Sequence, residues 1–326
     1  MERYDMKKVI AMGELLIDFI PKQKGVPLAE VYEFTKMPGG APANVAATVA
    51  KLGGLSGFIG QVGQDAFGDF LIDTLKKVNV DTSYLYQTDQ AKTALAFVSL
   101  KLDGQRDFIF YREPSADQLF QSSQINPIAL DQVILHFCSV SLSDYPIKQA
   151  HLEAIRIVKA QNGFISFDPN IRLSLFKDHQ AYRQVILEFL PYANLLKIAD
   201  DELEFITGIK DIHQAIQSLF IGDIELIILT KGSQGVELFT KSTHLVVPGI
   251  KVHAIDTTGA GDALIGAFLY QLSKAELTYA IQDAKLIEYL KFANAAAALT
   301  TTKFGAISAL PTLSEITDFL EAQTIY

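Results

Sequence analysis

The sequence has one cysteine, no apolar stretch long enough to span a bilayer, and fewer basic than acidic residues. Cys138 has no partner for an intrachain disulfide and lies in the apolar run 133–138, which is typical of a buried strand. Residues 1–8 are charged and show no signal-peptide pattern. We therefore expect a soluble protein of the reducing cytoplasm.

The small number of basic residues also limits the partners. A net charge of −9 argues against a nucleic-acid or membrane surface, so an anionic ligand must be met by a local pocket. The six histidines are scattered and show no metal-ligand spacing such as His-Glu-x-x-His. A zinc site or a cysteine nucleophile is therefore not expected.

Two common nucleotide-binding motifs are also missing. No Gly-x-x-x-x-Gly-Lys-Ser/Thr segment is present, which excludes a P-loop, and no Gly-x-Gly-x-x-Gly follows the first strand. The second absence weakens a nicotinamide-dependent oxidoreductase.

Strand-length apolar runs alternate with helical patterns along the chain, which is 49% hydrophobic. This alternation predicts one continuous α/β domain over 1–326, with a mostly parallel sheet between helical layers. Expected strands lie within 8–20, 58–62, 132–138, 164–168, 194–198 and 225–230. Expected helices cover 42–52, 67–78, 147–161, 178–190, 200–207, 212–220, 260–273 and 281–301.

One region departs from the alternation. The β-rich runs 93–102 and 105–111 are joined by Asp103-Gly104, a strong hairpin signal, and carry apolar side chains on both faces. We expect a small β-sheet lid formed by about 17–38 and 92–114. One face would close over substrate and the other would pack against a second subunit.

The most informative segment is Asp256-Thr257-Thr258-Gly259-Ala260-Gly261-Asp262, which leads into the apolar stretch 263–269. Glycines at a loop-to-helix junction let backbone N–H groups converge on an anion, assisted by the helix dipole. A carboxylate repels that anion, so Asp262 is better suited to accepting a proton beside it. The pattern indicates phosphoryl transfer to a hydroxyl, although glycine-rich turns and first-turn aspartates also occur without a function.

Three other segments could complete a site. Asp18 lies in an apolar strand, and 38–44 holds glycines and Asn44 that suit a polyol, although an exposed edge and a tight loop explain them equally well. The segment 230–235 should turn the chain at the carboxyl end of a strand, where ligands bind in open α/β sheets. Lys197 and Glu202 could be solvated surface charges.

Together these motifs resemble the ribokinase-like (pfkB) carbohydrate kinases. The segments 39–44, 230–235 and 256–262 match that family in order and spacing over essentially the whole chain, as do 60–65 and 292–297. Segments 13–18 and 110–117 look most like those of bacterial fructokinases. The resemblance implies a three-layer α/β/α fold with a small β-sheet lid.

The resemblance also implies site residues. Asp262 would be the catalytic base, and Gly259, Ala260 and Gly261 would form the anion hole. The implied sugar site comprises Asp18, Gly39, Gly40 and Asn44, with Arg112 and Arg172 as candidate contacts. The implied ATP site comprises Lys197, Thr230, Lys231, Gly232, Gly235 and Asn294.

Family members also use cations. A monovalent cation such as K⁺ would be held near Asp256, Thr258, Lys303 and Gly305. Mg²⁺ would accompany ATP, organised through water by Glu202. The family's Asn-x-x-Glu reads Ala199-Asp200-Asp201-Glu202 here, so the asparagine contribution is missing.

We therefore expect an ATP- and magnesium-dependent kinase that converts D-fructose to fructose 6-phosphate, with small-molecule partners and a homodimer through the lid. A 2-keto-3-deoxygluconate kinase or another sugar kinase of the family stays open, because Arg112 and Arg172 could serve a carboxylate. A sugar-binding regulator without turnover is a third reading, which the intact Asp262 and glycine loop disfavour.

Overall fold

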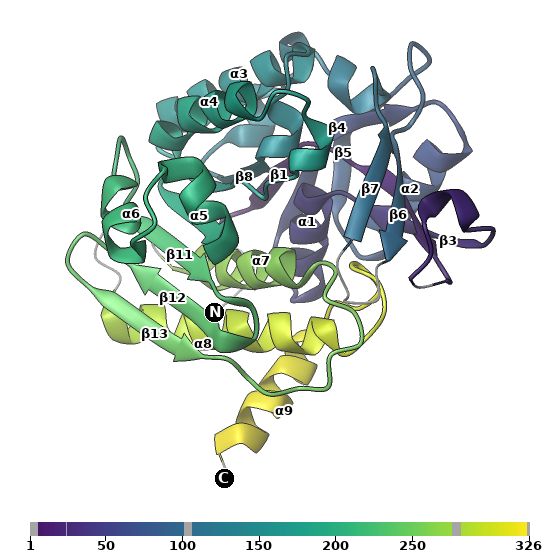
Figure 1. The fold of residues 1–326 in the computed structure, drawn as a ribbon. Helices are drawn as coiled ribbons and strands as arrows, with labels where there is room; N and C mark the ends of the chain where they lie inside the picture. The colour runs from purple at the N-terminus through teal and green to yellow at the C-terminus, as the bar shows by residue number, and fades with distance from the viewer. Residues whose placement is uncertain (1–5, 24, 101–105, 276–281, 325–326) are drawn as a thin grey trace.

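A nine-stranded, mostly parallel sheet lies at the centre of the computed structural model, which describes residues 6–23, 25–100, 106–275 and 282–324 (Figure 1). Across the sheet the strands run in the order β13-β12-β11-β10-β9-β8-β1-β4-β5. The pairs β11–β12 and β12–β13 are antiparallel, and the other neighbouring strands are parallel. The bounds are β1 Val9–Met12, β4 Ser56–Gly63, β5 Asp81–Thr88, β8 Ile134–Cys138, β9 Phe164–Asp168, β10 Leu195–Ala199, β11 Leu226–Thr230, β12 Gly235–Phe239 and β13 His244–Pro248.

Helices cover both faces of this sheet, because alternate strand residues point to opposite sides. On β1, Ile10 and Met12 belong to the core under α3–α6, whereas Val9 belongs to the core under α1, α7 and α8 (Figure 1). The helices are α1 Ala41–Lys51, α2 Ala66–Lys77, α3 Pro146–Ala160, α4 His179–Phe189, α5 Asp200–Thr207, α6 Ile212–Ser218, α7 Ala260–Ser273, α8 Asp283–Thr301 and α9 Leu313–Thr324. The three-layer fold class expected from the sequence is confirmed.

A separate four-stranded sheet lies beside the main one, in the order β3-β2-β6-β7. Its strands are β2 Leu16–Pro21, β3 Phe34–Gly39, β6 Leu95–Leu100 and β7 Arg106–Tyr111, and we call it the lid sheet. The Asp103-Gly104 turn lies outside the described residues. The apolar run 8–20 holds two strands, because Gly13, at φ 148°, separates β1 from β2, which belong to different sheets.

The two faces of the lid sheet differ. On one face Phe19 stacks on Phe97 with ring centroids 4.8 Å apart, and Phe67 of α2 contacts Phe19 at 5.9 Å. On the other face, Asp18 and Phe110 line a pocket against the main sheet. The alternation of strand side chains therefore gives the lid sheet one ligand-facing side and one aromatic side.

Four elements had no clear sequence signal: β5, β12, β13 and α9. The edge strand β5 reads Asp-Thr-Ser-Tyr-Leu-Tyr-Gln-Thr, and few of its side chains are buried, so it lacks the apolar run that marks the central strands. Strands β12 and β13 form a short antiparallel hairpin beyond β11. Strands β5 and β13 are weakly buried edges of the sheet, so their hydrophobic pattern gives little signal.

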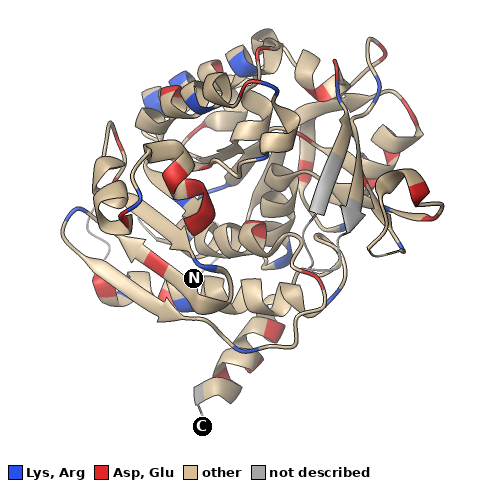
Figure 2. Cartoon of the chain, in the orientation of Figure 1, with Lys and Arg blue, Asp and Glu red and all other residues tan. Residues whose placement is uncertain are grey.

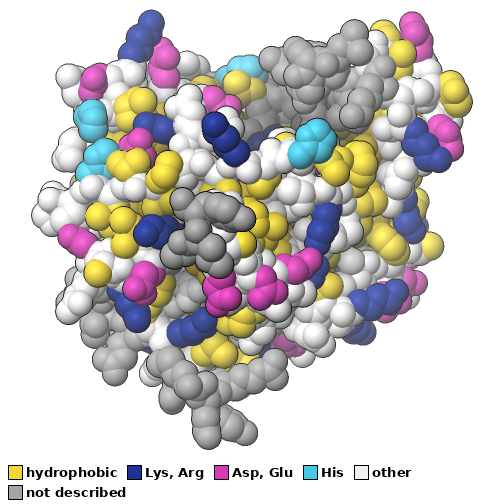
Figure 3. All heavy atoms as spheres, turned by 90° about the horizontal axis from the view of Figure 1, so that it is seen from below, with side chains coloured by type: hydrophobic (Ala, Val, Ile, Leu, Met, Phe, Trp, Pro, Cys, Tyr) yellow, Lys and Arg dark blue, Asp and Glu magenta, His cyan; other side chains and the backbone are white. Residues whose placement is uncertain are grey.

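Charged side chains are spread over the molecule (Figure 2). On the face seen from below, basic and acidic side chains are interspersed with apolar ones (Figure 3). Acidic residues gather at the first turn of α5, where Asp200 and Asp201 line the pocket. Within the described ranges, no helix is both long and apolar enough to cross a membrane.

Candidate active site

A pocket of about 680 Å³ opens between the lid sheet and the carboxyl ends of β1, β9, β10 and β11. This is the edge of a parallel sheet at which open α/β folds bind ligands. Eleven residues expected from the sequence line it: Asp18, Gly40, Asn44, Arg172, Lys197, Thr230, Gly232, Thr258, Gly259, Gly261 and Asp262. The pocket therefore brings together segments that are more than 200 residues apart.

The anion loop is the segment Gly259-Ala260-Gly261 at the start of α7. Gly259 has φ 75°, a left-handed backbone conformation that favours glycine, and it forms the N-cap of the helix. The first turn of a helix carries N–H groups without helical partners, and here Gly259 and Gly261 expose that turn to the pocket. The geometry suits a phosphate group.

Asp262 lies in the first turn of α7 and is 8% exposed. Asn44 of α1 donates from Nδ2 to Asp262 Oδ2 at 2.8 Å, which fixes the orientation of the carboxylate. Burial raises the pKa of Asp262, while the Asn44 hydrogen bond and the charge of Lys197 oppose that rise. A raised pKa makes the ionised carboxylate a better proton acceptor.

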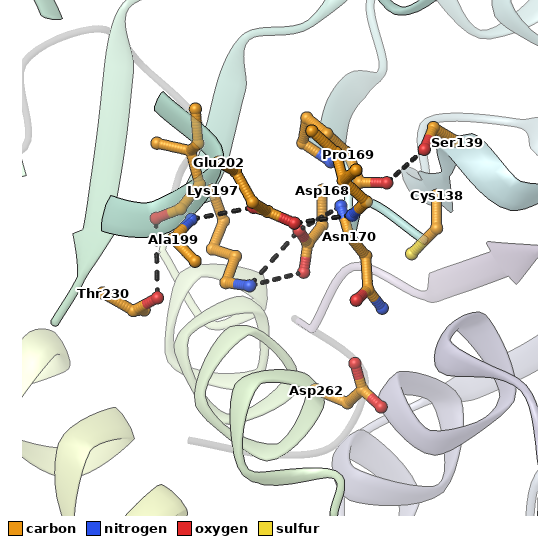
Figure 4. A network of polar contacts seen from close by, with 12 residues as sticks. Cys138, Ser139, Asp168, Pro169, Asn170, Lys197, Ala199, Glu202, Thr230 and Asp262 are labelled. Carbon is orange, nitrogen blue, oxygen red and sulfur yellow. Dashed lines mark hydrogen bonds and ion pairs between the residues drawn. The ribbon is translucent and has the colours of Figure 1, made fainter. Parts of the chain in front are cut away.

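Lys197 supplies positive charge beside the anion loop. Its Nζ lies 3.0 Å from Asp168 Oδ2 (Figure 4), and a Cβ added to Gly261 would lie 3.3 Å from that Nζ. Burial lowers the pKa of Lys197, but the attraction of Asp168 and Glu202 outweighs it and leaves the pKa raised. Lys197 is therefore charged near neutral pH.

Comparison with known proteins assigns the chain that forms this pocket to a family. The family model described as pfkB family carbohydrate kinase matches residues 6–313. The chain belongs to the pfkB family of carbohydrate kinases.

This pfkB-family chain is 43% identical to fructokinase-2 of Zea mays over 314 residues, covering 96% of this chain and 93% of the relative. The structure of the Xylella fastidiosa fructokinase with bound ATP is similar, with a TM-score of 0.89 at 34% identity, covering 98% of this chain and 99% of that one. A Vibrio cholerae fructokinase double mutant, in its fructose-, ADP- and potassium-bound form, has a TM-score of 0.88 at 36% identity, covering 97% and 99%.

Glu202 is buried behind the pocket of this kinase. Its carboxylate accepts the backbone N–H of Ile171 at 2.5 Å and that of Ala199 at 2.9 Å, and so joins the loop after β9 to the start of α5 (Figure 4). Burial raises the pKa of Glu202, and the charge of Lys197 opposes that rise. Both carboxylate oxygens thus have a backbone donor, and the Glu202 side chain lies outside the pocket lining.

The residues expected around a monovalent cation partly converge. Asp256 Oδ1 accepts from the Thr258 hydroxyl at 2.6 Å, and Asp256 Oδ2 accepts from the Gly305 N–H at 3.0 Å. The Lys303 side chain instead pairs with Glu315 at 2.7 Å. No group of three or more His, Cys, Asp or Glu side chains in the described part of the chain is arranged to hold a metal by itself.

The nucleotide residues expected from the sequence divide into two groups. Thr230 and Gly232 line the pocket. Lys231, Gly235 and Asn294 do not: Lys231 forms an ion pair with Glu237, a Cβ on Gly235 would lie 2.2 Å from the Val247 carbonyl oxygen, and Asn294 donates to the Pro248 carbonyl at 2.9 Å. All three residues contact the β12–β13 hairpin, and their role at the nucleotide stays a prediction.

Of the two arginines expected to contact substrate, only Arg172 lines the pocket. The buried guanidinium of Arg112 donates to Asp117 Oδ2 at 2.9 Å and to the Val140 carbonyl at 3.0 Å. Arg112 thus lies outside the lining but beside Glu14, which lines the pocket, and its contact with substrate stays a prediction. Gly39 and Ala260 also lie outside the lining, although a Cβ on Gly39 would collide with the Asp18 carboxylate.

Sequence reasoning missed several polar residues at the site. Glu14, Asn170, Asp200 and Asp201 line the pocket, and Asp168 holds Lys197. Each follows or ends a parallel strand, and polar residues in those positions were the signal that could have identified them.

The Lys197–Asp168 ion pair predicts a stability effect. Lys197→Met leaves a fully buried carboxylate without its cation, so we expect the free energy of unfolding to fall by about 3–5 kcal/mol in urea denaturation. Lys197→Met combined with Asp168→Asn removes both charges and should recover much of that loss. A double variant as unstable as the single one would show that the ion pair is not the cause.

Proposed function

We propose that this chain transfers the γ-phosphoryl group of ATP to D-fructose and forms fructose 6-phosphate. The observation that carries the proposal is Asp262, a buried carboxylate with a raised pKa, next to the Gly259–Gly261 loop in one pocket. The Zea mays and Xylella fastidiosa relatives named as fructokinases support the choice of sugar.

The residues divide the reaction between two ends of the pocket. Asp18 and Asn44, with the backbone at Gly39 and Gly40, hold the sugar so that the reacting hydroxyl faces Asp262. Asp262 accepts the hydroxyl proton as that oxygen attacks the γ-phosphorus in line and the bond to ADP breaks.

On the phosphate side, the N–H groups at Gly259, Ala260 and Gly261 and the Lys197 ammonium stabilise the charge on the transferred group. Thr230 and Gly232 border the nucleotide, and Lys231, Gly235 and Asn294 shape the wall behind it. In this assignment the lid sheet, within about 17–38 and 92–114, excludes water from the sugar.

Cations complete the assignment. Mg²⁺ usually takes few protein ligands and several phosphate and water ligands, which agrees with Glu202 acting through water and with the acidic first turn of α5. When bound, Mg²⁺ neutralises phosphate charge. We place K⁺ near Asp256, Thr258, Gly305 and the backbone at Lys303, and the similar Vibrio cholerae fructokinase is described in a potassium-bound form. We assign this ATP-dependent activity to the cytoplasm.

The nearest alternative is a 2-keto-3-deoxygluconate kinase. Pairing of Arg112 with Asp117 removes one of the two arginines that favoured a carboxylate, and Arg172 is the one left at the pocket. A coupled ADP-release assay with a panel of sugars tests the choice. Fructose should give the highest kcat/KM, and a preference for the keto acid would overturn the assignment.

Replacement of Asp262 tests the mechanism. Asp262→Asn keeps the shape of the side chain but cannot accept the proton, so kcat should fall about 100- to 10,000-fold with the melting temperature nearly unchanged. Asp73→Asn, on the exposed side of α2, is the matched control and should behave as wild type. Turnover within a few-fold of wild type in the Asp262 variant would contradict its role as base.

We also infer a homodimer through the aromatic side of the lid sheet. Tyr111 and Ile109 on the edge strand β7 are 64% and 51% exposed, and Tyr111 contacts Phe97 at 5.5 Å. Exposed apolar side chains on an edge strand favour pairing with a second copy.

Light scattering after size exclusion at micromolar concentration tests this interface. Wild type should elute as a dimer, and Ile109→Lys with Tyr111→Lys should shift it to a monomer. Ile128→Lys, at an 80% exposed position outside the lid sheet, is the control and should leave the dimer intact. A monomeric wild type would contradict the interface.

A further inference from the structure

Glu14 is a buried carboxylate at the pocket wall that the proposed mechanism does not use. It follows β1 and is 3% exposed, yet it lines the same pocket as Asp18, Asn170 and Asp262. A carboxylate withdrawn from water costs free energy unless its oxygens have partners. Its position therefore suits a hydrogen bond from a bound ligand.

The protein supplies only part of that partnership. Ser141 donates its hydroxyl to Glu14 Oε2 at 2.6 Å, and the backbone N–H of Glu14 itself also donates to this carboxylate. A carboxylate oxygen can accept more than one hydrogen bond, and a sugar offers several hydroxyl donors. Glu14 thus has acceptor capacity at the edge of the pocket.

The charges around Glu14 leave this end of the pocket negative. Arg112 is the nearby cation, but Asp117 already pairs with it, so one arginine faces two carboxylates. Burial raises the pKa of Glu14, and Arg112 and Ser141 limit that rise. Arg172 donates to its neighbouring Ile171 carbonyl at 2.9 Å and acts electrostatically on Asp262 and Asp168.

We propose that Glu14 is a specificity-determining residue, which accepts a hydrogen bond from a hydroxyl of the neutral sugar and repels substrates that carry a carboxylate at that end. The inference rests on the proposed fructokinase activity and explains why that site would choose fructose over a sugar acid. Discrimination here comes from a repulsive group as well as an attractive one.

Glu14→Gln is the test, because it keeps the shape and removes the charge. We expect kcat/KM for fructose to fall about 10- to 100-fold, mainly through KM, because hydrogen bonds to charged groups are the stronger ones. KM for ATP should stay unchanged, and the ratio of kcat/KM for 2-keto-3-deoxygluconate to that for fructose should rise at least about tenfold. Replacement of a residue with a purely structural role would not change this ratio, and it would not change the KM for fructose while leaving the KM for ATP unaltered.

Glu14→Asp keeps the charge and shortens the side chain. It should raise KM for fructose while still rejecting the keto acid, which separates repulsion from shape. Glu153→Gln, on the exposed surface of α3, controls for loss of a carboxylate elsewhere and should match wild type.

Two results would overturn the inference and can be told apart. If wild type prefers fructose and Glu14→Gln leaves both KM for fructose and the substrate ratio unchanged, the role of Glu14 fails and the proposed function stands. If wild type prefers the keto acid, both fail.

Discussion

The close packing of α1 against α7 is the constraint on which the site depends. A Cβ at Gly266 of α7 would lie 2.6 Å from Thr48 Cβ of α1, so the Thr48 side chain packs directly on the backbone of α7. Their first turns consequently converge at the pocket, where Asn44 of one helix holds Asp262 of the other. Helix α1 is rich in alanine, which permits this contact on its other turns as well.

An anionic ligand enters a pocket that is itself acidic. Glu14, Asp168, Glu202 and Asp262 are buried in or behind its walls, and Lys197 is the cation that lies among three of them. In the proposed reaction, the phosphate group is attracted by a small region, the anion loop with Lys197, and by the cations that accompany ATP. Elsewhere the carboxylates suit hydroxyl groups, which donate hydrogen bonds to them.

Local patterns predicted most of the fold and the chemical core of the site. Gly259-Ala260-Gly261-Asp262 could be interpreted because loop, helix start and acid are contiguous. Arg112 could not, because its partner depends on the turn that follows β7, which returns Asp117 to the guanidinium. Lys231 and Asn294 likewise bind neighbours that only the tertiary structure brings close. The sequence pattern identifies which chemical groups are available, whereas the tertiary structure determines which of them already have partners within the protein.

The lid sheet leads directly into α1, the helix whose Asn44 donates a hydrogen bond to the proposed base Asp262. Strand β3 ends at Gly39 and α1 begins at Ala41, so Gly40 is the single joint between them. Its φ of 110° and the Glu14 carbonyl oxygen, which would lie 2.4 Å from an added Cβ, admit only glycine without strain. A hinge motion of the lid sheet relative to α1 would be absorbed by the two torsions of Gly40 or passed on to Asn44. Gly40 is therefore a mechanical coupling between the cover of the pocket and the proposed base.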